Sequence, residues 1–138
     1  MKTIDYLAHT ADVRMRLRAD SALELFEAAL EGMNQLIKTH ACQPPHSLPL
    51  KKQITLKSEN LTTLLIEFLG EVLTQSHLNK ALFCKLEIEH LSEKKISASI
   101  HGYPVEEIDE DIKAVTYHEA NVHRNTANQY ETIVVFDI

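Results

Sequence analysis

Carboxylates near the two ends of the sequence are the groups best suited to chemistry. Asp12 ends the motif His-Thr-Ala-Asp at residues 9–12, just before a predicted strand. Thr and Asp often cap turns through their own backbone, so a turn is the simpler interpretation and a ligand site the alternative. At the other end, the Asp137 carboxylate lies one residue from the α-carboxylate of Ile138. Such an anionic corner suits a hard cation, although taken alone it is more simply a solvated chain end.

Two further charge patterns stand out. Five of the six residues 106–111 are acidic, and they supply nearly all of the net charge of −6. They form either a solvated loop, without the spacing of an EF-hand, or a docking surface for a basic partner. Arg14, Arg16 and Arg18 alternate with apolar residues and so share one strand face. That face either contacts phosphate or an acidic partner, or pairs with acids on neighbouring strands. Lys113, next to the acidic run, is most simply an ion-pair partner.

Several enzyme classes are excluded by missing motifs. The three glycines, at 32, 70 and 102, are too far apart for a P-loop or a dinucleotide fingerprint, which need closely spaced glycines around phosphate. The sequence has no Gly-x-Ser-x-Gly elbow, no His-Glu-x-x-His motif and no cysteine spacing typical of zinc sites. The sequence therefore does not indicate a recognised catalyst.

Hydrophobic periodicity predicts an α+β fold in a single domain over residues 1–138. We expect antiparallel sheet with two amphipathic helices packed on it, in the order strand, helix, strand, helix, then a four-strand meander. Asp20 or Ser21 is expected to cap the first helix, and Ser58 or Asn60 the second. The last strand is apolar on both faces, so we expect it to be central, with Asp137 at its open end. The predicted strands cover residues 13–19, 54–57, 82–88, 96–100, 113–123 and 130–136, and the helices cover 23–37 and 61–72.

Composition is ordinary for a globular protein, with 44% hydrophobic and 25% charged residues. No apolar run approaches the ~18 residues that span a bilayer, and the first residues do not resemble a signal peptide. Two cysteines are too few for a disulfide scaffold and favour a reducing compartment. We therefore expect a cytoplasmic protein that does not contact a membrane. The negative net charge argues against nonspecific coating of nucleic acid.

Three segments together resemble the archease family. They are His-Thr-Ala-Asp-Val at 9–13, Ile-Lys-Ala-Val-Thr-Tyr-His at 112–118, and Ile-Val-Val-Phe-Asp-Ile at 133–138. The helices after residues 21 and 60 also fit, so the resemblance runs along the whole chain. It implies a non-catalytic accessory protein of the RtcB-type RNA ligase, which promotes ligase guanylylation and multiple turnover in tRNA splicing and RNA repair. RNA contact would then be indirect or transient.

The resemblance also implies site residues. A divalent cation, Ca²⁺ before Mg²⁺ or Mn²⁺, would be bound by Asp12, Asp137 and the carboxylate of Ile138. Lys113 would contact phosphate or an acidic ligase residue, and His9 would orient the loop that carries Asp12. Ala8 departs from the family, which commonly has Asp there, and so removes one acid from the site. Alternative functions are a stand-alone metal-dependent phosphate-ester enzyme and a chaperone-like RNA-binding module.

Overall fold

The structure is a computed structural model that describes residues 1–7, 12–43 and 47–138. The described residues form eight strands and two helices. The elements are β1 (Lys2–Leu7), β2 (Asp12–Ala19), α1 (Ala22–Ile37), β3 (Leu50–Lys57), α2 (Leu61–Asn79), β4 (Ala81–Leu91), β5 (Lys95–Pro104), β6 (Ala114–Thr116), β7 (His123–Arg124) and β8 (Tyr130–Asp137).

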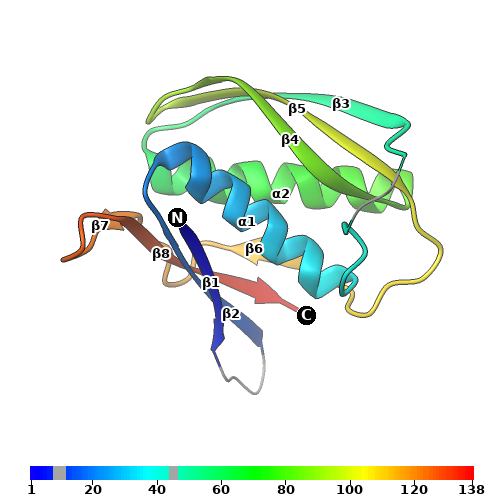
Figure 1. Cartoon of the computed structure of the whole chain (residues 1–138), viewed down its shortest axis with the longest axis horizontal. Coiled ribbons are helices and arrows are strands. Elements are labelled where there is room, and N and C mark those ends of the chain that lie inside the picture. Colours follow the sequence, from blue (N-terminus) through cyan, green and yellow to red (C-terminus); the bar gives the residue numbers. More distant parts are fainter. Residues whose placement is uncertain (8–11, 44–46) are drawn as a thin grey trace.

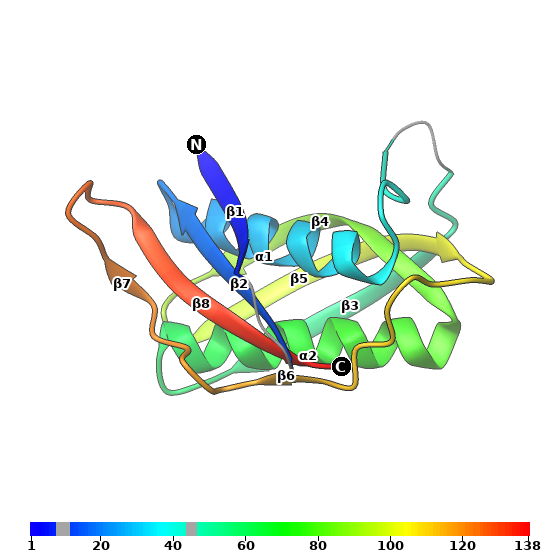
Figure 2. The same cartoon turned by 90° about the horizontal axis from the view of Figure 1, so that it is seen from below.

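Two antiparallel sheets enclose the helices in a three-layer arrangement (Figures 1 and 2). In one sheet the strand order is β1-β2-β8-β6, with β7 also paired to β8, and in the other it is β3-β5-β4. Helix α1 contacts β1, β2 and β4, whereas α2 contacts β3, β4 and β6. Each helix therefore buries side chains against both sheets. The prediction of an α+β fold with two helices packed on antiparallel sheet is confirmed.

Both helices begin at polar N-caps, which satisfy amides that the first turn leaves without partners. The Ser21 hydroxyl accepts a hydrogen bond from the Glu24 amide at 3.1 Å, and the Asn60 side chain accepts one from the Thr63 amide at 2.8 Å. Of the two pairs of candidate caps, Ser21 and Asn60 thus fill the role.

The core lies between the sheets, around both helices. The ring centroids of Phe26 on α1 and Phe68 on α2 are 5.4 Å apart, and both side chains are fully buried. Below them, Met15 of β2 pairs in register with Val134 of β8, and neither is exposed. The period-two pattern of residues 13–19 thus marks the strand face that covers the helices, as the sequence predicts.

The expected four-strand meander is wrong in its connectivity. Strands β4 and β5 pair with each other, but the chain then crosses to the other sheet, where β8 inserts between β2 and β6. The crossing segment is held to the end of α1, because the Asp109 amide donates to the Ile37 carbonyl at 2.7 Å. Short connections favour neighbouring strands, but this segment passes the helix layer before pairing resumes.

Most strands extend beyond their predicted ends, one predicted strand is divided and one strand was not predicted. Residues 113–123 do not form one strand, because a turn closed by a hydrogen bond from the Ala120 amide to the Tyr117 carbonyl separates β6 from β7. Glu119 in that turn has a φ of 62°, in the left-handed region that a strand cannot continue through. Strand β1, at the outer edge of its sheet, was not predicted.

No helix in the described part of the chain is long and apolar enough to cross a membrane.

Candidate functional site

Strand β8 brings the two ends of the sequence together. It lies between β2 and β6, as the sequence predicts for a strand that is apolar on both faces. In this register Asp12 of β2 lies directly opposite Asp137, and Ala114 of β6 lies opposite Asp137 on the other side. Directly opposed residues of an antiparallel pair have side chains on the same face and Cβ atoms about 4.5–5.5 Å apart. The carboxylates of Asp12 and Asp137 therefore share one face at one end of the sheet.

Lys113 is held beside the same carboxylates by the backbone. Its amide donates a hydrogen bond to the Asp137 carbonyl at 2.7 Å, one residue before β6 begins. The Lys113 side chain is exposed, and within the described residues its ammonium makes no ion pair. The sequence prediction of an ion-pair partner for the acidic run is not borne out there. The structure instead shows an exposed Lys113 side chain whose backbone is bonded to that of Asp137.

Two predicted site residues remain, Ile138 and His9. Ile138 follows Asp137 directly, with 37% of its surface exposed, and its role as a ligand stays a prediction. His9 lies outside the described residues. We call Asp12, Asp137 and Ile138 the carboxylate corner. The resemblance to the archease family implied these three residues, whereas the strand pattern alone favoured a turn at Asp12 and a solvated chain end at Asp137.

Arg14 places a positive charge near the corner on β2. Arg14, two residues along β2 from Asp12, forms a two-pronged ion pair with Glu119, with N–O distances of 2.7 and 2.8 Å. The Glu119 hydrogen bonds raise the pKa of Arg14, and the negative charges of Glu119 and Asp12 add to this. The guanidinium thus remains charged, but most of its hydrogen bonding is directed to Glu119 rather than to the corner.

Most of the arginines at 14, 16 and 18 form surface ion pairs. Arg14 pairs with Glu119, and Arg18 pairs with Asp5 of the neighbouring strand at 2.8 Å. Arg16 has no ion pair or hydrogen bond through its side chain among the residues described. Two of the three arginines therefore follow the interpretation of pairing with nearby acids, and the face is not a continuous cationic surface.

The donors of the corner fit a hard divalent cation. All are carboxylates, the ligands that Ca²⁺ and Mg²⁺ prefer. Like charges placed directly opposite on paired strands repel, and a bound cation relieves that repulsion. No group of three or more His, Cys, Asp or Glu side chains with metal-binding geometry occurs in the described ranges. The corner thus supplies the side-chain carboxylates of Asp12 and Asp137, and further ligands would come from Ile138, water or a partner.

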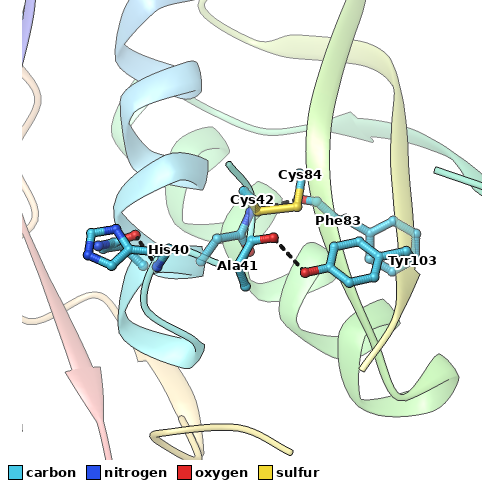
Figure 3. Close-up of a disulfide and its surroundings, with 8 residues drawn as sticks. His40, Ala41, Cys42, Phe83, Cys84 and Tyr103 are labelled. Carbon is cyan, nitrogen blue, oxygen red and sulfur yellow. Dashed lines mark hydrogen bonds between the residues drawn. A yellow bond between two sulfur atoms is a disulfide. The ribbon is translucent and has the colours of Figure 1, made fainter. Parts of the chain in front are cut away.

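Sequence reasoning missed a disulfide. Cys42, in the loop after α1, is bonded to Cys84 of β4, with the Cα atoms 5.4 Å apart (Figure 3). The Tyr103 hydroxyl donates to the Ala41 carbonyl at 2.5 Å and fixes the same loop to β5. Two cysteines separated by 42 residues carry no pairing signal in the sequence, so only the packing of the loop against β4 identifies the bond.

Comparison with known proteins identifies relatives along the whole chain. The model of the Archease protein family (MTH1598/TM1083) matches residues 5–138. "Protein archease" of Methanosarcina mazei is 31% identical, with 99% of this chain and 97% of the relative aligned. The protein of the same name from Pyrococcus abyssi is 27% identical over the full length of both chains.

Solved structures share the fold. The solution structure of Methanobacterium thermoautotrophicum protein 1598 superposes with a TM-score of 0.77 at 19% identity, covering 98% of each chain. The crystal structure of an archease from Thermotoga maritima, described as a possible chaperone, gives a TM-score of 0.65 at 19% identity, covering 96% of this chain and 94% of the other. At this level of identity the likeness concerns the fold.

Proposed function

Because the chain belongs to the archease protein family, we propose that it is a non-catalytic activator of an RtcB-type RNA ligase and works through a divalent cation at the carboxylate corner. In this role it promotes guanylylation of the ligase and repeated turnover, and it contacts RNA at most indirectly. The ligase is the macromolecular partner, and Ca²⁺ is the first candidate cation.

One observation carries the proposal. The three motif segments that resemble the family are far apart in the sequence, yet β8 aligns Asp137 with Asp12 on one side and with Ala114, next to Lys113, on the other. A turn cap and a solvated chain end do not require these segments to meet. Their convergence on one end of one sheet supports a shared site.

The residues of the corner have distinct roles in this proposal. The carboxylates of Asp12, Asp137 and Ile138 hold the cation, which supplies positive charge that can bind an anionic group of the partner. The exposed Lys113 ammonium, positioned by the hydrogen bond of its own amide to Asp137, binds a phosphate or a ligase carboxylate.

RNA joining by a cognate ligase, held far below the substrate concentration, tests the proposal. The wild-type protein should convert a single round of joining into many, whereas Asp12→Ala and Asp137→Ala should add little while remaining folded. Glu131→Ala is the matched control, because Glu131 lies on the same face of β8 at the opposite end, across from Arg18. Loss of activation in that control, or no activation by wild type, contradicts the proposal. Phosphate release from simple esters by the isolated protein would instead support the stand-alone enzyme.

A further inference from the structure

An apolar cavity of about 190 Å³ lies where the C-terminal ends of α1 and α2 meet the segment that links β5 to β6. No residue of the carboxylate corner lines it, although Ile112 in its wall directly precedes Lys113. Figure 2 shows this linking segment running beside α2. The walls of the cavity are aliphatic. They are formed by Ile37, Leu73, Ala81, Val105, Ile108 and Ile112.

A buried hydroxyl in the cavity lacks a partner. Ser76 lines the cavity from α2 and is only 7% exposed, yet its Oγ has no hydrogen bond within the part of the chain that the structure describes. A polar group taken out of water without a partner destabilises the folded state. Ile108, at the same cavity, is 45% exposed, which is unusual for a large apolar residue beside an apolar hollow. Both residues indicate that the cavity is completed by a ligand.

The linking segment is held firmly enough to form a wall. The Thr39 amide donates to the Asp109 carboxylate at 2.9 Å, and the Asp109 amide donates to the Ile37 carbonyl at 2.7 Å. These two bonds tie the segment to the end of α1. Asp109 is thus occupied within the fold, whereas the Glu106 and Glu110 side chains make no hydrogen bond or ion pair with the other described residues.

The rim of the cavity is mainly acidic. Glu106 and Glu110 line it, and the exposed Glu107 and Asp111 flank them in sequence. Two cationic or titratable groups also lie there, Lys80 and His77, and the His77 Nε2 is 3.7 Å from an Asp111 carboxylate oxygen. An acidic rim repels the phosphates of nucleic acids and anionic lipids, and it attracts Lys and Arg.

We infer that the cavity is a docking pocket for one large aliphatic side chain of a protein segment that carries Lys or Arg on either side of it. The aliphatic side chain fills the hollow, and the flanking cations face Glu106 and Glu110. The Ser76 hydroxyl donates to an acceptor of the bound segment, such as a main-chain carbonyl. An anchor in an apolar pocket surrounded by complementary charge is the usual composition of a small docking site.

The probes for the test are synthetic dodecapeptides that carry one central Leu among Lys and Ser. Binding to the isotope-labelled full chain is followed by NMR, which reads the methyl groups of Ile108 and Ile112 directly. The Leu peptide should shift those methyls and bind more weakly as salt is raised. Replacing Leu by Ser, or all Lys by Glu, should weaken binding about tenfold or more. No shift at millimolar peptide, or equal binding of the three peptides, overturns the inference.

Variants of the protein distinguish binding in the pocket from nonspecific binding to the surface. Ile108→Asp should weaken binding of the Leu peptide about tenfold, because it places a charge at the hollow without changing a buried residue. Leu78→Asp is the matched control, since Leu78 is 74% exposed on α2 and does not line the cavity. An equal loss in both variants overturns the inference. Asp137→Asn should leave peptide binding unchanged, so a failure of the carboxylate corner and a failure of this pocket are distinguishable.

Discussion

Asp12 of β2 and Asp137 of β8 lie directly opposite each other, although they are near the two ends of the sequence. Two carboxylates in this arrangement repel, and β-sheets do not favour it. The strands nevertheless pair in register from Asp12 to Ala19, since the apolar pairs next to the corner, such as Val13 with Phe136, stabilise them. The apolar pairs thus offset the repulsion between the two carboxylates, and a cation bound at the proposed site would relieve it.

Asp137→Asn should therefore have opposite effects with and without cation. In a chelator we expect the free energy of unfolding to rise by about 0.2–1 kcal/mol, because the like-charge pair is removed. With added Ca²⁺ the wild type should be stabilised and the variant should not, because a ligand that binds only the folded state raises its stability. Thermal unfolding in chelator and in a calcium series measures both effects.

Glu131→Gln on the same strand is the control for the stability changes expected in chelator and in calcium. It should keep the calcium response of the wild type, because Glu131 lies opposite Arg18 and far from the corner. A calcium response that survives in Asp137→Asn would show that the cation binds elsewhere.

Reduction of the Cys42–Cys84 disulfide should lower stability substantially. The bond closes a loop spanning 42 residues, for which loop-closure entropy gives a contribution of about 4 kcal/mol. Urea unfolding with and without dithiothreitol measures the difference, as two thiols of the reagent are oxidised and the two protein thiols are released. In the double variant Cys42→Ala/Cys84→Ala, the reagent should have no effect.

Counting free thiols in untreated, folded protein checks the premise of that prediction. None should react before reduction, and two should react afterwards. Two reactive thiols before reduction would mean that the cysteines are not bonded in the purified protein.

Two glycine substitutions should change the free energy of unfolding in opposite directions. A Cβ at Gly102 of β5 would collide with the backbone of Leu82 and Phe83 on β4, so Gly102→Ala should cost about 1–3 kcal/mol. A Cβ at Gly70 of α2 would meet nothing within 4 Å, and Gly70→Ala should stabilise the helix by about 0.5–1 kcal/mol. Denaturant unfolding of the pair measures both, and an equal effect in the two variants would contradict the close approach of β4 and β5.

Asp109 should contribute to the loss of stability in acid. The hydrogen bond from the Thr39 amide lowers the pKa of this carboxyl below its usual 3.8, with the Lys38 charge adding to it. A lowered pKa contributes stability that is present above pH 3.8 and disappears as the pH falls through the lower folded value. Asp109→Ala should therefore be less stable near neutral pH and should lose less stability on acidification.

Unfolding measured from pH 7 to pH 2 tests this assignment. Asp111→Ala is the comparison, because Asp111 lies in the same segment but accepts no backbone hydrogen bond among the described residues. If Asp111→Ala flattens the acid side of the profile as much as Asp109→Ala, the amide of Thr39 is not the cause.

Local patterns were sufficient to predict the elements that carry the site. The alternation in residues 13–19 and the apolar faces of 130–136 identified β2 and the central β8. The candidate caps, Asp20 or Ser21 and Ser58 or Asn60, indicated where the helices begin, and the structure selects Ser21 and Asn60. From the resemblance and the central position of β8, the sequence also suggested that Asp12 and Asp137 could meet. The register now supports that meeting.

The remaining features depend on contacts that no local pattern contains. The expected meander is divided between two sheets, and the segment that crosses between them is held by the hydrogen bond from the Asp109 amide to the Ile37 carbonyl at the end of α1. These two residues are far apart in the sequence. The partner of Cys42 and the hollow beside Ser76 likewise arise only when distant segments pack. Strand β1 was missed because its short, mixed sequence is made a strand by pairing with β2.

The central position of β8 has a consequence for how the protein is made. During synthesis β1 and β2 appear first, and the whole edge of β2 that will pair with β8 stays unpaired until residues 130–137 have left the ribosome. Pairings this distant in sequence are slow to form and leave an open strand edge that other chains can join. The nascent chain therefore exposes the β2 edge from the time β2 is made until β8 emerges, and Asp12 meets Asp137 only then.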